Sequence, residues 1–295
     1  MRHIVCAPLA LMLLLSGCGG NPFGATGGGG GGGGTPPDPV ASEVPESVRV
    51  NMNSASFTPG APTITIDLDA QDASALEATY VRNAAFDVQN YAAYTYQEST
   101  SNRYVVALVQ EVGAAKAVVA VDAGQFANYY GGGLYSRADV FSLPGAGVIN
   151  YSGSYAGLLN VGEVQPGPGG LFDPERAYRT EGRVLVTADF TNMALSGAID
   201  NRNVLDVPGQ TLDAVALFAT GITDTGTFEG RVQRLDPTAG AFVDAGAYAG
   251  TFAGVGASEI ATLLVFSPVG NVPLLVEHGM FVLSNCTVAG GPACP

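Results

Sequence analysis

The sequence contains no tryptophan, two histidines and four cysteines among its 295 residues. Histidine is the side chain that most often transfers protons near neutral pH, so its scarcity restricts the possible chemistry. His3 lies in the N-terminal leader, and a Ser-His-Asp or Cys-His device in the mature chain could use only His278. The alternative is that His278 is an ordinary residue at the end of a strand. We therefore predict no catalytic residues, no cofactor and no enzyme activity.

Positive charge is also scarce, with 12 Lys and Arg against 26 Asp and Glu and a net charge of −14. Such a surface repels nucleic acid and anionic membranes, so neither is expected as a partner of the folded part. The acidity favours a partner with a basic patch, or it serves solubility alone. With 47% hydrophobic and 13% charged residues, the chain can bury a packed core.

The first seventeen residues have the features of a signal peptide. Arg2 and His3 precede an apolar run from Ile4 to Leu15 that is too short to span a bilayer. Leu15-Ser16-Gly17-Cys18 then resembles a bacterial lipobox, in which the Cys thiol receives diacylglycerol. The alternative is an ordinary signal peptide with an incidental Cys. We expect a signal peptide over 1–17 and a lipid on Cys18, and Gly19 favours the outer membrane of a Gram-negative bacterium.

Residues 18–44 are predicted to form a flexible linker between the lipid and the folded chain. Eight consecutive glycines are followed by Pro36, Pro37 and Pro39, and this composition cannot bury apolar area. A glycine-rich phosphate loop is a poor alternative, because no strand precedes the glycines and no helix with Lys follows them. The membrane is therefore expected as a partner through the lipid anchor.

Two mature cysteines, Cys286 and Cys294, remain near the C-terminus. An oxidising compartment favours a disulfide between them that closes a small Gly/Pro loop. A metal pair is the alternative, but the spacing matches no zinc signature. Asp67 and Asp69 could share a strand face and hold a cation, or could point into solvent. We predict the disulfide and no metal site.

The chain reads as short strands. Between residues 182 and 190, Val184, Val186 and Ala188 alternate with polar or exposed positions, as in a strand with one buried face. Farther on, Tyr248 and Phe252 share a face with Gly250 and Gly254, so large and absent side chains alternate as in the wall of a small barrel. Residues 103–124 predict two strands joined at Glu111–Ala115, a hairpin with Gly113 in its turn.

Several motifs resemble the β-barrel domain of the transferrin-binding protein B family of bacterial surface lipoproteins. The motifs are a strand ending in Asp189-Phe190 and a final hairpin pattern that here includes Gly250, Phe252, Gly254 and Glu259. Ala253 and Ala261 depart from the family pattern. The resemblance implies an all-β chain, with a handle-like β region over 45–145 and an antiparallel barrel of about eight strands over 146–295. In this pattern Asp189 forms a turn and Glu259 anchors the hairpin, so both are structural.

The resemblance also implies a non-enzymatic binding protein in nutrient or iron acquisition or in host interaction. Tyr129, Tyr130 and Tyr135 lie among glycines and are candidates for a partner-binding surface, since Tyr offers contact area at little entropic cost. The alternative is that they fill gaps beside those glycines. The partner is an unknown protein or small molecule. A lipocalin-like carrier of an apolar ligand inside the barrel is the second functional hypothesis.

Overall fold

The structure is a computed structural model, and it describes residues 35–69, 75–97, 104–123, 130–161, 172, 176–268 and 275–286. The signal peptide, Cys18, the polyglycine run, Tyr129 and Cys294 lie outside the described residues. The lipid anchor and the disulfide therefore stay predictions. The described part is almost entirely β, which confirms the predicted fold class. Its helices are η1 (Ala41–Glu43), α1 (Glu46–Arg49) and η2 (Ala84–Phe86). None of the described helices is long and apolar enough to cross a membrane.

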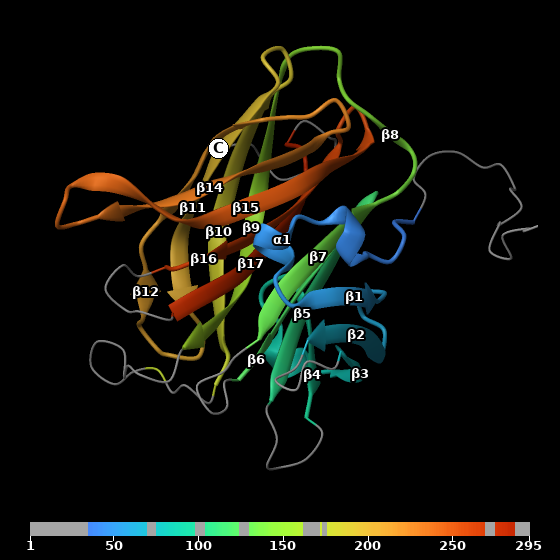
Figure 1. Ribbon diagram of the computed structural model, residues 1–295, viewed down its shortest axis with the longest axis vertical. Coiled ribbons are helices and arrows are strands. Elements are labelled where there is room, and N and C mark those ends of the chain that lie inside the picture. Colours follow the sequence, from blue (N-terminus) through green and yellow to red (C-terminus); the bar gives the residue numbers. More distant parts are fainter. Residues whose placement is uncertain are drawn as a thin grey trace, which may run out of the picture. The chain divides into compact units, whose positions relative to one another are not determined.

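Seven strands form an antiparallel sheet in which each strand pairs with the next along the chain (Figure 1). They are β1 (Met52–Ser56), β2 (Thr63–Asp69), β3 (Ala75–Arg82), β4 (Ala92–Tyr96), β5 (Val105–Val112), β6 (Ala115–Asp122) and β7 (Gly131–Arg137). The sheet curls so that its two ends approach, and Asn51 N donates a hydrogen bond to Gly131 O at 3.2 Å. The predicted β5–β6 hairpin is confirmed, with Gly113 in its turn at a φ of 55°, where glycine is favoured.

The second half of the chain forms a closed antiparallel barrel. Its strands are β9 (Val148–Val161), β10 (Tyr178–Asp189), β11 (Ala194–Val204), β13 (Val215–Gly221), β14 (Thr227–Asp236), β15 (Ala241–Val255), β16 (Glu259–Phe266) and β17 (Leu275–Ser284). Pairing runs from β10 through β9 and β17 round to β11, and β10 pairs with β11 to close the ring. The predicted eight-stranded barrel is confirmed. Two short strands lie outside the ring: β12 (Thr211–Leu212), which pairs with β11, and β8 (Phe141–Ser142), which pairs in parallel with β15.

The barrel interior is filled with aromatic side chains. Phe252 lies at its centre, with ring centroids 5.1 Å from Phe190 and 5.3 Å from Phe228. The predicted alternation of large and absent side chains is confirmed, since a Cβ on Gly230 or Gly250 would collide with a neighbouring aromatic ring. Tyr151, Tyr155, Phe266 and Phe281 are also fully buried. These side chains occupy the space that a ligand inside the barrel would need.

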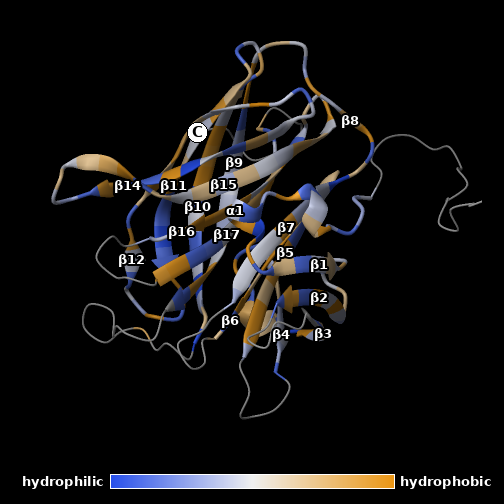
Figure 2. Ribbon diagram, in the orientation of Figure 1, coloured by the Kyte–Doolittle hydropathy of each residue, from blue (hydrophilic) through white to orange (hydrophobic). Residues whose placement is uncertain are grey.

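The seven-stranded sheet packs on the outer face of the barrel at β9, β15, β16 and β17. Barrel residues whose side chains point outward join the core of the sheet, namely Ala156, Leu158, Ala249, Ala253, Ala261, Leu263, Met280 and Val282. As a result every residue of β6 and the first six of β5 are buried, because both faces of these strands are covered. In Figure 2, β7 is pale because it begins with three glycines, which allow close approach to its neighbours.

Residues 35–44 run along the edge of the seven-stranded sheet, and we call this segment the strap. Ser136 Oγ on β7 donates to Pro37 O at 2.5 Å, and Ala55 N on β1 donates to Pro39 O at 3.4 Å. The buried Lys116 Nζ donates to Asp38 Oδ1 at 2.8 Å. Burial would raise the pKa of Asp38, but hydrogen bonds from Lys116 and Ser56 outweigh it and hold the pKa below its usual value. The last part of the predicted linker therefore contacts both ends of the sheet.

Candidate binding surfaces

The three candidate tyrosines do not form a common exposed surface among the residues that the structure describes. Tyr129 lies outside them, and Tyr130 is half-buried against the core of the sheet. Tyr135 is only 3% exposed and belongs to that same core. The glycines at the start of β7 allow other neighbours to approach, since a Cβ on Gly131 would collide with His278 and one on Gly133 with Leu263. The burial of Tyr135 leaves little of its side chain accessible to a partner, and the assignment of these tyrosines to a binding surface stays a prediction.

The polar motif residues Asp189 and Glu259 lie next to turns of the barrel, at the end of β10 and the start of β16. Asp189 Oδ1 accepts hydrogen bonds from the amides of Thr191 at 2.9 Å and Asn192 at 3.1 Å. Hydrogen bonds from Asn192 lower the pKa of Asp189, so the carboxylate stays charged and closes the β10–β11 turn. Glu259 Oε2 accepts a hydrogen bond from Ser258 Oγ at 2.8 Å. Gly254 has a φ of 70°, and a Cβ at this position would collide with the Glu259 carboxylate. The Glu259 side chain at this site therefore requires glycine at position 254.

The two candidate cation ligands share a face of β2, and both are engaged by one side chain. Asn53 Nδ2 donates to Asp69 Oδ1 at 2.9 Å and to Asp67 Oδ1 at 3.4 Å. Among the described residues, no group of three or more His, Cys, Asp or Glu side chains is placed to hold a metal ion. Asp67 and Asp69 therefore contribute side-chain hydrogen bonds between strands β1 and β2.

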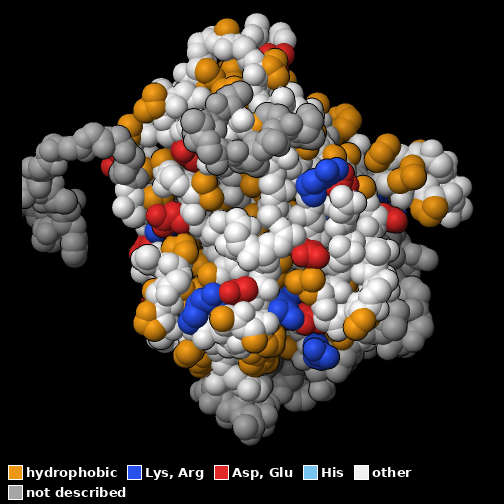
Figure 3. All heavy atoms as spheres, turned by 180° about the vertical axis from the view of Figure 1, so that it is seen from behind, with side chains coloured by type: hydrophobic (Ala, Val, Ile, Leu, Met, Phe, Trp, Pro, Cys, Tyr) orange, Lys and Arg blue, Asp and Glu red, His pale blue; other side chains and the backbone are white. Residues whose placement is uncertain are grey.

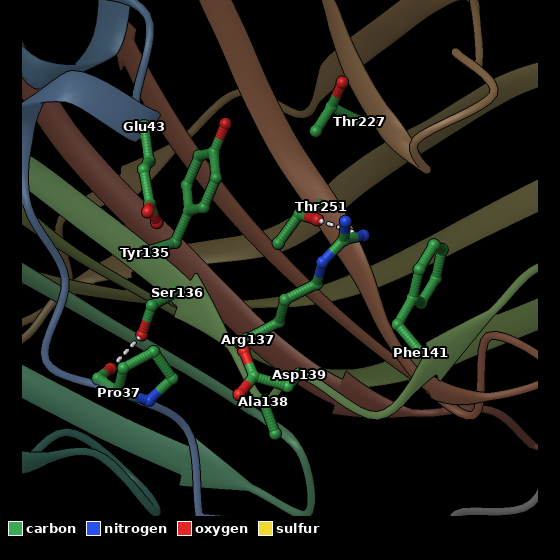
Figure 4. A pocket seen from close by; sticks show the side chains of 10 residues that line it. All are labelled: Pro37, Glu43, Tyr135, Ser136, Arg137, Ala138, Asp139, Phe141, Thr227 and Thr251. Carbon is green, nitrogen blue, oxygen red and sulfur yellow. Dashed lines mark hydrogen bonds between the residues drawn. The ribbon is translucent and has the colours of Figure 1, made fainter. Parts of the chain in front are cut away.

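A crevice of about 430 Å³ opens where the strap, β7, β8 and the barrel strands β14 and β15 meet (Figure 4). Its charged lining comes from Glu43, Arg137 and Asp139, and its hydroxyls include those of Thr227 and Thr251. Arg137 Nη1 donates to Thr225 O at 2.7 Å, Phe252 O at 3.0 Å and Thr251 Oγ1 at 3.2 Å. Its guanidinium carbon lies 3.9 Å from the centroid of the Phe141 ring. The side chain is thus held in one orientation at the mouth of the crevice.

An exposed apolar stripe crosses the outer face of the barrel on strands that the seven-stranded sheet leaves uncovered. It comprises Leu185 on β10, Ala198 on β11, Ala216 and Phe218 on β13, Leu235 on β14 and Phe242 on β15. The strand register places Leu185 opposite Ala198, Ala198 opposite Ala216, and Leu235 opposite Phe242. Phe242 is 60% exposed, Leu235 46% and Phe218 44%. Figure 3 shows hydrophobic side chains on the β14–β15 hairpin, which projects to the right.

The stripe contains a mostly apolar cleft of about 370 Å³ beneath the β14–β15 hairpin. Ala198, Ala216, Leu235, Pro237 and Phe242 line it together with Asp213, Ala214 and Val215. Two ion pairs flank the stripe, Arg183 with Asp200 at 2.9 Å and Arg231 with Asp244 at 2.7 Å. These pairs neutralise Arg183 and Arg231, and Asp213 places a carboxylate in the lining of the cleft.

A buried polar cluster lies inside the barrel below the aromatic core. Arg202 and Glu277 form an ion pair with no exposed side-chain surface. Glu277 Oε1 also accepts hydrogen bonds from Thr180 Oγ1 at 2.7 Å and Tyr155 Oη at 2.8 Å, and Arg202 Nη1 donates to Asp213 O at 2.7 Å. Sequence reasoning missed this cluster. A signal existed, because Thr180 lies on the inward-facing side of β10 with Val184 and Val186.

His278 lies on the opposite, outward-facing side of β17, buried between the barrel and the sheet. It is 3% exposed, and its Nδ1 has no hydrogen-bond partner among the described residues. Burial lowers its pKa from 6.5 to about 4, so it is neutral at pH 7. A neutral imidazole buried between the sheet and the barrel fits the interpretation of His278 as a packing residue.

Acidification is expected to destabilise the protein through His278. In the unfolded chain His278 binds a proton near pH 6.5, whereas in the folded protein it does so only near pH 4. The unfolded state therefore binds more protons between these values, and stability falls as pH drops through this window, by up to about 3 kcal/mol at 1.36 kcal/mol per pKa unit. Denaturant titrations at pH 7 and pH 4.5 measure the loss, which should be smaller in His278→Leu. An equal loss in both proteins would contradict the assignment.

The fold and surfaces define a class: a closed antiparallel barrel with a second, curled sheet packed on its outer face. Solved structures with a similar chain trace include transferrin-binding protein B from Haemophilus parasuis, at 13% identity and a TM-score of 0.41, covering 79% of this chain and 54% of that one. The chain thus spans about half the length of that protein. HpuA from Kingella denitrificans, solved in complex with human haemoglobin, is 13% identical with a TM-score of 0.34. The match covers 87% of this chain and 96% of that one. No protein-family model and no curated protein matches the chain.

Proposed function

We propose that this protein is a lipid-anchored, non-enzymatic binding protein that works outside the cytoplasm, at the outer membrane. The observation that carries the proposal is the apolar stripe. Phe242, Leu235 and Phe218 are large apolar side chains that remain exposed side by side on neighbouring strands, whereas most large apolar residues of the barrel are buried. Contiguous exposed apolar surface with a polar rim marks a place where another macromolecule binds. The lipobox at Cys18 and the polyglycine segment supply an anchor and reach.

The charges around the stripe favour a partner that presents an apolar side chain next to basic residues. Asp236 accepts hydrogen bonds from the amides of Ala239 and Thr238, which lower its pKa and keep it ionised. Asp213 lines the cleft itself, and neither carboxylate forms an ion pair within the described part of the chain. Exposed charges of this kind mainly raise the association rate, and salt screens them.

A lipocalin-like carrier is the weaker hypothesis. Such a protein needs a cavity inside the barrel, whereas the described interior holds Tyr151, Tyr155, Phe252 and Phe281 in close contact with their neighbours. The filled interior favours recognition on the outer surface. The motif resemblance implies iron acquisition from a host protein, so host serum is one of the two sources of partners in the experiment below.

Replacing Phe242 with serine should reduce partner capture about tenfold, which corresponds to 1.4 kcal/mol of binding free energy. The full mature protein is immobilised and incubated with host serum in one arm and with the bacterium's own envelope extract in the other, at low and high salt. Val81→Ser is the matched control, because Val81 is 58% exposed but lies on β3 in the other sheet. Capture that survives Phe242→Ser, or that the control variant also loses, would contradict binding at the stripe.

A further inference from the structure

The crevice in Figure 4 holds Arg137, which forms no ion pair in the described part of the chain. Arg49, Arg176 and Arg234 form none there either, whereas Arg82, Arg179, Arg183, Arg202 and Arg231 all do. Burial lowers the pKa of Arg137, and the nearby Glu43 and Tyr135 offset part of that shift. A partly desolvated, unpaired guanidinium costs free energy unless something balances its charge.

The hydrogen bonds of Arg137 leave a defined edge of the guanidinium available. The three acceptors in the crevice wall all take their bonds from Nη1. Nε and Nη2 donate to no acceptor in the described part of the chain. These two nitrogens form the edge that binds a carboxylate through two parallel hydrogen bonds. The Phe141 ring at 3.9 Å keeps the guanidinium plane in place, so little entropy is lost when a ligand binds.

The acidic side chains around the crevice restrict the kind of anion that can bind. Glu43 and Asp139 line it, and Figure 4 shows Glu43 and the Arg137 guanidinium on different sides of the Tyr135 ring. Burial raises the pKa of Tyr135, and the negative charges of Glu229 and Glu43 raise it further. A phosphate or other polyanion would be repelled by these carboxylates, whereas a ligand with one carboxylate and one ammonium group would be attracted at both ends.

We propose that this crevice binds a small zwitterion of the amino-acid or dipeptide type. The ligand carboxylate takes the Nε and Nη2 edge of Arg137, and its ammonium group faces Glu43. The hydroxyls of Thr227 and Thr251 and the ring of Phe141 complete the lining. This site is separate from the apolar stripe, so it does not depend on the proposed protein partner.

Titration of the mature protein with glycylglycine, followed by amide chemical shifts, tests the proposal. We expect saturable shifts at Ser136, Arg137 and Thr251 in the millimolar range. Acetate carries only the carboxylate and methylammonium only the ammonium group, so each should bind at least tenfold more weakly than glycylglycine. Glycine alone serves as a third probe, which reports whether one residue spans the distance between Arg137 and Glu43.

Variants separate ligand binding from the role of Arg137 in tying β7 to the barrel. Arg137→Gln should abolish the shifts, but it also removes the Nη1 hydrogen bonds that connect β7 to the barrel, so its effect combines binding and stability. Glu43→Gln changes an exposed side chain and should weaken glycylglycine binding about tenfold, worth 1.4 kcal/mol, without lowering stability. Glu46→Gln, on the neighbouring helix α1, is the matched control and should bind normally. No saturable shift, acetate binding as tight as glycylglycine, or normal binding by Glu43→Gln would each overturn the proposal.

Discussion

Replacing Glu277 with alanine is expected to lower the free energy of unfolding by about 3–5 kcal/mol. The substitution leaves the Arg202 guanidinium buried without its counter-ion inside the barrel. It also removes the acceptor of the hydroxyls of Tyr155 and Thr180, which are themselves buried. Unsatisfied buried donors add to the cost of an uncompensated charge. Urea titrations monitored by tyrosine fluorescence and circular dichroism measure the difference between the variant and the wild type.

Two further proteins serve as controls for this result. Asp200→Ala breaks the exposed ion pair with Arg183 and should cost less than about 1 kcal/mol, because water screens that pair. In the double variant Arg202→Met with Glu277→Leu, both charges are removed, so most of the lost stability should return. A Glu277→Ala protein as stable as Asp200→Ala would show that the cluster does not stabilise the barrel.

Replacing Cys18 with alanine is expected to move the protein from the membrane fraction to the soluble fraction. Each buried CH₂ of an acyl chain contributes about 0.8 kcal/mol to membrane binding, so loss of the diacylglycerol removes nearly all of the anchoring free energy. Phase partition in detergent measures the change. Cys286→Ala is the control and should remain in the detergent phase, since Cys286 lies at the end of the barrel. If Cys18→Ala partitions like the wild type, the lipoprotein interpretation is wrong.

The barrel was largely predictable from the sequence because its pattern is local. Val184, Val186 and Ala188 alternate with outward-facing residues within one strand, and Tyr248, Gly250 and Phe252 do the same in another. Such period-two patterns follow from strand geometry alone. Gly113 similarly marks a turn because it adopts a positive φ.

The sites were not predictable, because they depend on contacts between residues far apart in the chain. Arg202 and Glu277 are 75 residues apart, and neither has a neighbour in sequence that indicates the other. The stripe requires the register of five strands, and the crevice requires the strap to lie beside β7. Tyr135 illustrates the difficulty: a tyrosine among glycines is compatible with an exposed surface, and the covering sheet and barrel decide that it is buried.

The strap determines where mechanical load enters the protein. Any pull transmitted from a membrane anchor along residues 18–34 reaches the folded part at the strap, where Pro37, Asp38 and Pro39 are held by Ser136, Lys116 and Ala55. These bonds distribute the force across β1, β6 and β7 of the seven-stranded sheet. The segment that follows the strap also contacts the barrel, because Ser47 Oγ donates a hydrogen bond to Glu229 Oε1 on β14 at 2.6 Å. Tension on the proposed anchor would therefore be shared between the seven-stranded sheet and barrel strand β14.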